Sequence, residues 1–296
     1  MNNKILIVAH GDLDGITSAA LLAEQLGIEY EDLNVVFTQP FLVDKIVIPD
    51  EIEKVYVVDI AINNRDPGMT HKFIADLGDK LVRWYDHHEG WSENVMIGGV
   101  DFDRDVSDMK YYNFIIDPTM SACAELLGNE CDKRVRDAII ADTREGKLSL
   151  TGQLIERAVK SDMSNDTIRM WAVKLLMGDE DFRQSLEAAE QAYQLVETET
   201  DRLSQHYEVK GNVACVDATE SNHAYDLTQF LLAGQELATF AVVKTVNPVT
   251  NEEMVTVATN SKTNLVILFG LPSGAPFRVS LPVARLEEVL RKLEAV

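Results

Sequence analysis

The sequence predicts an α/β protein whose first half folds as a doubly wound parallel sheet. Short, continuous apolar runs, typical of strands buried on both faces, alternate there with longer helical patterns. Such alternation is typical of a parallel sheet covered by helices on both sides. In addition, three of the predicted strands run directly into motifs that contain aspartate. Because ligands of such sheets bind beyond the carboxyl ends of the strands, these motifs predict where the functional site lies.

The elements of the first half follow from these patterns in order. Gly27 and Gly78 end two of the helices, as glycine commonly does at helix C-termini. The predicted strands span residues 4–9, 34–38, 55–58 and 81–85, and the predicted helices span residues 16–26, 71–77, 121–127 and 134–141, with further helices up to residue 177.

The second half predicts a connecting helix and then a smaller α/β domain. The long polar segment 181–207 carries apolar residues at Leu186, Ala189, Tyr193 and Val196, and we interpret it as the connecting helix. Strands are predicted at 213–216, 239–243 and 254–258, and a helix at 283–293. We therefore expect a catalytic domain over residues 1–180, a connecting helix over 181–207 and a C-terminal substrate domain over 208–296.

The chain carries a formal net charge of −22, from 49 acidic and 27 basic residues. Such a surface repels long polyanions, because nucleic-acid affinity depends on neutralisation of phosphates by Lys and Arg. A nucleic-acid partner is therefore expected to be short, unless a groove between the domains gathers Arg65, Arg83, Arg104, Arg144 and Lys262. Adaptation of the surface to salt is another explanation for the excess of acids.

The sequence indicates neither a membrane protein nor a secreted one. No apolar run approaches the ~20 residues of a membrane span, and the run at residues 5–9 is too short for a signal peptide. Cys123, Cys131 and Cys215 are odd in number and lack metal-finger spacing, which indicates reduced thiols. We expect a cytoplasmic protein without a membrane partner, and the sequence leaves a homodimer open.

The first motif with candidate metal ligands is the segment from His10 to Gly15, directly after the first predicted strand. Asp12 and Asp14 can both face a metal ion if the backbone turns sharply, and Gly11 and Gly15 permit such a turn. An Asp-x-Asp-Gly segment also occurs in ordinary turns and in calcium loops. The remaining calcium-loop ligands, including the glutamate at the twelfth position, are missing here.

Three further acidic positions close predicted elements. Asp59 ends a buried strand, although a helix cap would also explain it. Asp86 ends the next strand and is followed by His87 and His88, whose imidazoles are good metal ligands. Asp142 closes a helix, where its charge opposes the helix dipole and a cation would offset that cost. This mixture of carboxylates and imidazoles suits Mn²⁺ or Mg²⁺ better than a thiolate-binding metal.

Taken together, these motifs resemble the four successive motifs of the DHH phosphoesterase superfamily. The matching segments are His10–Gly15, Val58-Asp59, Asp86-His87-His88 and Asp142-Thr143, and Asp117–Ala122 is similar to the segment between the third and fourth motifs. The match covers about residues 4–150, and the His-x-Asp-x-Asp spacing of the first motif resembles the RecJ and oligoribonuclease branches.

The resemblance implies a role for each matching residue. Asp59 would bridge two metal ions, Asp14, His87 and Asp142 would complete one site, and Asp12 with His10 would hold the other. The implied catalytic residues are His88, which would contact the scissile phosphate, and Asp86, which would orient the histidines. Two Mn²⁺ ions, with Mg²⁺ as the alternative, would activate a water molecule for attack on phosphorus.

The C-terminal domain departs from the pattern of the family's associated domain. That domain ends in a glycine-rich stretch with a histidine that binds substrate phosphate, and the segment 269–278 in this place lacks both. Candidate substrate contacts are Ser261, Lys262, Gly274 and Arg278, and ordinary turns explain these segments equally well.

The expected function is metal-dependent hydrolysis of phosphodiester or phosphomonoester bonds in short oligonucleotides or dinucleotides. One alternative is a catalytically silent scaffold with the same fold, but such a relative should have lost carboxylates that this chain keeps. The other is a single-strand-specific exonuclease on longer strands, which the net charge disfavours.

Overall fold

The computed structural model describes residues 4–63, 66–88, 91, 96–97, 100–101, 113–221, 223–247, 251–271 and 277–296. The chain divides into two compact units, Met1–Gln191 and Ala192–Val296. The boundary between them falls inside the long helix α7 (Arg183–Ser204), which occupies most of the segment predicted to connect two domains. The predicted limits at residues 180 and 207 stay predictions.

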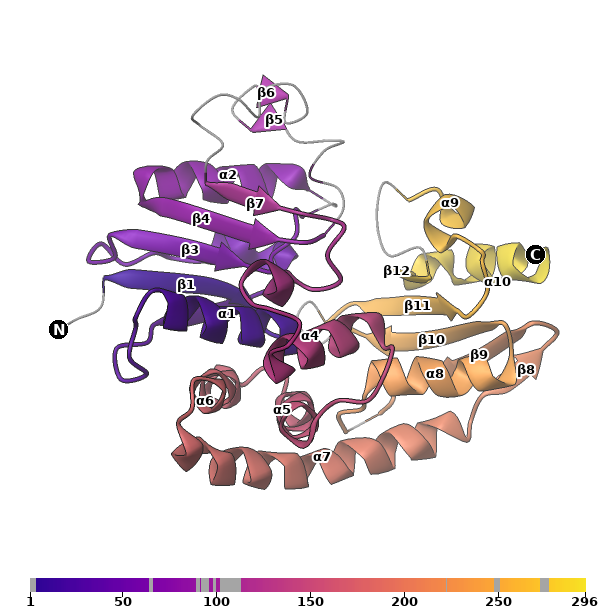
Figure 1. Cartoon of the computed structure of the whole chain (residues 1–296). Helices are drawn as coiled ribbons and strands as arrows, with labels where there is room; N and C mark the ends of the chain where they lie inside the picture. Colours follow the sequence, from indigo (N-terminus) through magenta and orange to yellow (C-terminus); the bar gives the residue numbers. More distant parts are fainter. Residues whose placement is uncertain are drawn as a thin grey trace. The chain divides into compact units, whose positions relative to one another are not determined.

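The first unit is built on a parallel sheet of five strands in the order β2-β1-β3-β4-β7 (Figure 1). All four strand pairs are parallel, as the alternation of strands and helices predicts. The strands are β1 (Ile5–His10), β2 (Val35–Thr38), β3 (Lys54–Val58), β4 (Leu81–Asp86) and β7 (Phe114–Ile116).

Both faces of this sheet are covered, so the predicted doubly wound α/β fold is confirmed. Ile7 and Ala9 of β1 belong to one apolar cluster, whereas Leu6 and Val8 belong to the cluster on the opposite face. This alternation follows from the two-residue period of a strand. The first cluster is closed by α1 (Leu13–Gln25), α4 (Lys133–Thr143), α5 (Leu150–Ser161) and α6 (Asp166–Leu176), and the second by α2 (Pro67–Leu77) and the 3₁₀ helix η1 (Pro40–Lys45).

The helix ends carry the signals that the sequence predicts. Gly27 follows α1 with φ 64°, and Gly78 ends α2 with φ 49°. Asp12 is the N-cap of α1 and accepts a hydrogen bond from the Gly15 amide. The described residues of this unit also form the short 3₁₀ segments η2 (Gly78–Lys80), η4 (Cys123–Leu126) and η5 (Glu180–Phe182).

Two predictions in this unit were wrong or incomplete. The α-helix predicted at 121–127 is the shorter 3₁₀ helix η4. Its first amides bond to side chains instead of helix carbonyls. Glu125 accepts hydrogen bonds from the amides of Ser121 and Ala122, and Asp14 accepts them from the amides of Cys123 and Ala124. The strand β7 was not predicted, because three residues give no periodic signal. The strands β5 (Met96–Ile97) and β6 (Val100–Asp101), which pair with each other, are shorter still, with two residues each.

The second unit contains a five-stranded sheet in the order β12-β11-β10-β9-β8. Its β9–β10 pair is parallel and the other pairs are antiparallel. The strands are β8 (Glu208–Lys210), β9 (Val213–Asp217), β10 (Phe240–Val246), β11 (Glu253–Thr259) and β12 (Arg278–Pro282). The helices are α8 (Leu227–Leu237), α9 (Leu265–Phe269) and α10 (Leu286–Glu294), the last preceded by the 3₁₀ turn η6 (Val283–Arg285).

For the smaller α/β domain, the sequence correctly predicted three of the five strands and the last helix. Two apolar clusters again lie on the two faces of its sheet: Val242 of β10 packs with α9 and α10, and Val243 packs with α8. Among the described residues, no helix is both long enough and apolar enough to cross a membrane.

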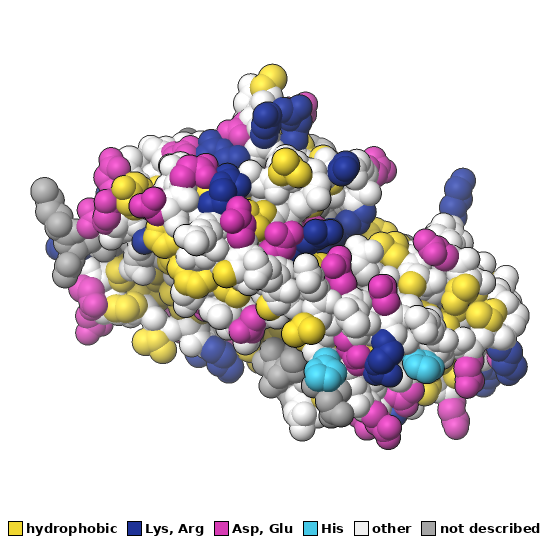
Figure 2. Space-filling view, turned by 90° about the horizontal axis from the view of Figure 1, so that it is seen from below, with side chains coloured by type: hydrophobic (Ala, Val, Ile, Leu, Met, Phe, Trp, Pro, Cys, Tyr) yellow, Lys and Arg dark blue, Asp and Glu magenta, His cyan; other side chains and the backbone are white. Residues whose placement is uncertain are grey.

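Charges of both signs share the surface. On the face shown in Figure 2, Lys and Arg side chains lie in groups among Asp and Glu side chains.

Candidate metal centre

The parallel sheet brings the predicted acidic and histidine residues of the first unit to one edge. β1, β3 and β4 are neighbours and run in the same direction, so His10, Asp59 and Asp86 all lie at their carboxyl ends. Asp14 comes from the first turn of α1 and Asp142 from the last turn of α4.

Asp14 lies in a helix rather than in the predicted glycine-permitted loop. Its side chain is fully buried and accepts hydrogen bonds from the backbone amides of Cys123 (2.6 Å) and Ala124 (2.9 Å). Gly15 is needed for space and not for a turn: a Cβ there would lie 2.3 Å from the His10 carbonyl oxygen. Because no side chain separates α1 from the end of β1, the start of the helix packs directly against the carbonyl group of His10.

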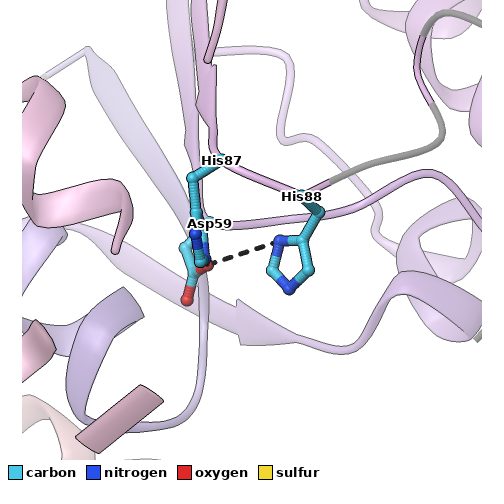
Figure 3. A group of neighbouring side chains, drawn as sticks. All are labelled: Asp59, His87 and His88. Carbon is cyan, nitrogen blue, oxygen red and sulfur yellow. Dashed lines mark ion pairs between the residues drawn. The ribbon is translucent and has the colours of Figure 1, made fainter. Parts of the chain in front are cut away.

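Asp59 has two unusual features. Its backbone adopts the left-handed region at φ 57°, which few residues other than glycine enter. Its side chain is 2% exposed, and its Oδ1 atom is buried without a hydrogen-bond partner. The helix-cap alternative is wrong, because α2 begins at Pro67 and has Asp66 as its N-cap. Asp59 instead lies beside His87 and His88 (Figure 3).

His87 presents the complementary unpaired atom. Its Nδ1 lies 3.4 Å from the Met120 carbonyl oxygen, which can only accept, and its buried Nε2 has no hydrogen-bond partner. That Nε2 lies 3.2 Å from Asp142 Oδ2, 3.5 Å from Asp59 Oδ1 and 3.6 Å from Asp14 Oδ2. A ring nitrogen that faces three carboxylates, with its other nitrogen oriented by a carbonyl, has the arrangement of a metal ligand.

His10 faces the other side of Asp59. Its Nε2 donates a 2.9 Å hydrogen bond to Gln39 Oε1 at the end of β2. Its Nδ1 then faces Asp12 Oδ2 at 2.8 Å and Asp59 Oδ2 at 3.6 Å. The structure therefore brings together His10, Asp12 and Asp59 as one group of donors.

Asp86 orients the imidazole of His88 through a hydrogen bond. Its carboxylate is fully buried and accepts hydrogen bonds from His88 Nδ1 (2.8 Å) and from the Trp91 indole (2.6 Å). His88 Nδ1 also lies 3.8 Å from Asp59 Oδ1, and its Nε2 points away from Asp59 (Figure 3). Because the side chain of His88 is 43% exposed, this Nε2 can meet a ligand that approaches from solvent.

The electrostatics of the cluster favour a cation. Burial raises the pKa of Asp14 well above its usual value, and the charges of Asp59 and Asp142 raise it further. Burial alone would lower the pKa of His87, but the neighbouring carboxylates of Asp142, Asp59 and Asp14 raise it to about 11. The pKa of His88 is likewise raised, to about 9, chiefly by Asp86 against the effect of burial. The carboxylates thus repel one another and hold protons on the imidazoles, a repulsion that a bound divalent ion would relieve.

The residues present fit a bound metal ion, and three groups of donors could hold one. One group of donor atoms comprises Asp14, His87 and Asp142, another comprises His10, Asp12 and Asp59, and a third comprises Asp59, His87 and His88. Within each group, the donor atoms lie within 4.8 Å of one another. Asp59 belongs to two of the groups, and its unpaired Oδ1 faces the unpaired Nε2 of His87.

The predicted substrate contacts lie in the second unit. The Ser261 hydroxyl donates to Thr263 Oγ1 at 3.0 Å, and Arg278 Nη1 donates to Thr228 Oγ1 at 3.2 Å. Lys262 follows Ser261 in the segment between β11 and α9, and Gly274 lies outside the described residues. Of the basic residues considered for a groove, Arg65 and Arg104 also lie outside them, and Arg144 pairs with Glu156 at 2.8 Å. Their roles stay predictions.

The structure adds residues that the sequence motifs did not reveal. They are Gln39, Trp91, Arg169 and the amides of Cys123 and Ala124. Gln39 alone had a detectable signal, because it is a polar residue at the carboxyl end of a predicted strand.

No model of a protein family matches the chain, and no curated protein matches it. Solved structures do match its fold. The pGpG-specific phosphodiesterase PggH of Vibrio cholerae has a TM-score of 0.60 and 14% sequence identity, with 98% of this chain and 97% of that chain covered. RecJ of Thermus thermophilus, solved in complex with Mn²⁺, has a TM-score of 0.64 and 14% identity, with 98% of this chain and 51% of that chain covered.

A third match is a DHH domain described as a member of the s1p family of ribosomal proteins. It has a TM-score of 0.57 and 13% identity, with 98% of this chain and 85% of that chain covered. These likenesses show that the chain shares the fold of these three proteins, one of which is described as a DHH domain, and this is the fold that the resemblance of the four motifs predicts.

Proposed function

We propose that this protein is a metal-dependent phosphoesterase that hydrolyses phosphodiester bonds of short oligonucleotides or dinucleotides. The observation that carries the proposal is the approach of two buried atoms, Asp59 Oδ1 and His87 Nε2, which face each other at 3.5 Å and make no hydrogen bond. A buried donor or acceptor without a partner costs about 1–3 kcal/mol, so such atoms are rare unless a ligand satisfies them.

Two divalent ions would be held by residues of the first unit. Asp14, His87 and Asp142 would hold one, His10 and Asp12 the other, and Asp59 would bridge them. Oxygen donors with imidazoles favour Mn²⁺ over a thiolate-binding metal, with Mg²⁺ as the alternative. When bound, such ions activate water and neutralise charge on a phosphoryl group.

The protein's own groups supply the remaining parts of the mechanism. Asp86 accepts the hydrogen bond from His88 Nδ1, so that His88 presents Nε2 to the substrate phosphate. The Asp86 carboxylate raises the pKa of His88, which favours the protonated form in which Nε2 would donate a charge-assisted hydrogen bond to a phosphate oxygen. The Trp91 indole holds the second oxygen of Asp86 and so fixes its orientation.

The net charge of −22 supports a short substrate, because the affinity of a long strand depends on Lys and Arg that neutralise its phosphates, and this chain has 49 acidic residues against 27 basic ones. The fold of PggH, which is described as a pGpG-specific phosphodiesterase, matches this chain over nearly its whole length and supports a dinucleotide. RecJ is described as an exonuclease, so longer strands belong in the test.

The test is a substrate panel assayed with Mn²⁺ and with Mg²⁺. It contains linear and cyclic dinucleotides, oligomers of up to about five nucleotides, long single strands and a phosphomonoester. Asp86→Ala is the active-site variant, and Asp76→Asn, an exposed acid of α2, is the matched control. We expect cleavage of dinucleotides by the wild type and the control, and loss of cleavage in Asp86→Ala and in excess chelator. Absence of metal-dependent cleavage across the panel would favour the silent scaffold.

A further inference from the structure

One buried side chain of α6 reaches the strand end that carries His10 and Asp12. Arg169 is 6% exposed, and its Nε donates a 2.9 Å hydrogen bond to the carbonyl oxygen of Gly11, 158 residues away in the chain. We propose that Arg169 is a positioning residue that builds the His10–Asp12 half of the metal centre and leaves the Asp14–His87–Asp142 half unaffected. The proposal rests on the proposed function and names a residue outside the four motifs.

The guanidinium is held in one orientation. Nη1 donates to Asp166 Oδ1 at 2.8 Å, Nη2 donates to the Met163 carbonyl, and the Phe37 ring lies 5.9 Å from Cζ. A guanidinium is a rigid planar fork, so fixing its two ends also fixes the direction of Nε. The Gly11 carbonyl, and with it the backbone between His10 and Asp12, is therefore tied to α6.

The contact needs a glycine at position 11, because a larger residue would leave no space for the guanidinium. A Cβ on Gly11 would lie 2.5 Å from Arg169 Nε and 3.0 Å from Cζ. Gly11 does not have the positive φ that would require glycine for conformational reasons. Glycine at this position is therefore explained by the approach of Arg169, and a side chain there would displace the guanidinium.

The two halves of the centre are supported by different contacts. Arg169 holds the backbone next to His10, and Gln39 holds its imidazole through Nε2, which directs Nδ1 to Asp12 and Asp59. In the other half, the amides of Cys123 and Ala124 hold Asp14, and the Met120 carbonyl faces His87. Loss of Arg169 should therefore weaken one cation and spare the other.

The experiment titrates Mn²⁺ into the metal-free full-length protein and follows binding by calorimetry and by electron paramagnetic resonance. The wild type should bind two ions whose spins couple. Arg169→Lys cannot keep all three hydrogen bonds. It should weaken one ion by about 10–100-fold, the usual effect of losing a residue that orients a metal ligand. The other ion should keep its affinity. At Mn²⁺ concentrations that fill only this site, the variant should show the resonance of a single Mn²⁺ ion without spin coupling.

A second variant tests whether Arg169 acts on the metal centre through its contact with Gly11. Gly11→Ala should weaken the same ion, and the double variant should bind Mn²⁺ no more weakly than the weaker single variant, because both changes break one contact. Arg134→Lys is the matched control: Arg134 also bonds a carbonyl, that of Leu176 at 2.8 Å, and the carboxylates of Asp132 and Glu24, but in another place. If Arg169→Lys does not fold, Gly11→Ala, which keeps every charge, carries the test.

The proposal is overturned if the Arg169 and Gly11 variants bind both ions as the wild type does, or weaken both ions equally. It is also overturned if Arg134→Lys produces the same selective loss. A wild type that binds no Mn²⁺ would overturn the proposed function together with this inference. A wild type that binds two coupled ions, with variants that do the same, would overturn this inference alone.

Discussion

At the scale of single residues, Asp59 carries costs that its own surroundings do not offset. A left-handed backbone costs most L-residues about 1–2 kcal/mol, although aspartate tolerates it better than others. The buried Oδ1 without a partner adds a further cost. Strain and unsatisfied polar atoms concentrate at functional sites, where a ligand makes use of them. Both features occur here in the one carboxylate that two of the three donor groups share.

Asp59→Ala and His87→Ala are each expected to reduce turnover to less than about a tenth of wild type. Loss of a group that only orients a metal ligand already costs about 10–100-fold. In the metal-free protein, Asp59→Asn, which also tolerates the left-handed backbone, should leave the melting temperature unchanged or raise it, because it removes repulsion between carboxylates. Steady-state kinetics and thermal melts in chelator measure the two effects. Turnover above a tenth in either variant would contradict the assigned roles.

The affinity for Mn²⁺ is expected to rise with pH and to be accompanied by release of protons. The acids around His87 raise its pKa to about 11, so the metal-free imidazole holds a proton at neutral pH. A proton and a metal ion compete for this Nε2, and each rise in pH below that pKa therefore favours the metal. Calorimetry between about pH 6.5 and 8.5, in buffers of different ionisation enthalpy, measures both quantities. Affinity independent of pH, without proton release, would show that His87 is not a ligand.

At the scale of elements, the site depends on how closely α1 follows β1. The helix begins at Leu13, so Asp12 caps it and Asp14 stands in its first turn, against the amides of η4. This arrangement leaves no room for a side chain at Gly15. The packing of one helix start thus sets the positions of two carboxylates.

Gly15→Ala is expected to lower both thermal stability and metal affinity. The new Cβ would lie 2.3 Å from the backbone oxygen of His10, so the strand or the helix must shift, at a cost of about 1–3 kcal/mol. Gly27→Ala is the control, because its Cβ would meet nothing within 4 Å and only the backbone at φ 64° is strained. Thermal melts and Mn²⁺ titrations compare the two. If Gly15→Ala binds metal no more weakly than Gly27→Ala, the close approach is unimportant for the site.

At the scale of the whole molecule, the chain has a net charge of −22, and its candidate metal centre itself consists mainly of acidic residues. A polyanionic substrate is repelled by such a surface, and bound cations can neutralise only the phosphates that they contact. The whole chain therefore favours substrates with few phosphates.

Dinucleotides to oligomers of about five nucleotides are expected to be cleaved much more efficiently than long single strands. A long strand gains affinity by releasing counterions along a basic track, and it usually stacks its bases on aromatic side chains. Labelled oligomers of increasing length, assayed at fixed Mn²⁺ and two salt concentrations, give kcat/KM for each length. Efficiency that climbs with length and collapses with salt would instead indicate an exonuclease on longer strands.

The sequence by itself determined the α/β class, the strand ends that carry Asp59, Asp86 and His87, and the position of Asp142 at a helix end. These features are local: a continuous apolar run forms a buried strand, and the residue after it lies at the sheet edge whatever the rest of the chain does. The same locality explains the misses at β7 and η4, where three or four residues give no periodic signal and hydrogen bonds from distant residues decide the backbone.

Only the tertiary structure decided how the donors pair and what holds them. The unpaired atoms of Asp59 and His87, the amides that bind Asp14, and the contact from Arg169 to Gly11 all join residues far apart in the sequence. Their distances depend on the strand order β2-β1-β3-β4-β7 and on the packing of α1, α4 and α6. No periodicity encodes such contacts, because each depends on side chains that meet only after the sheet and its covering helices have formed.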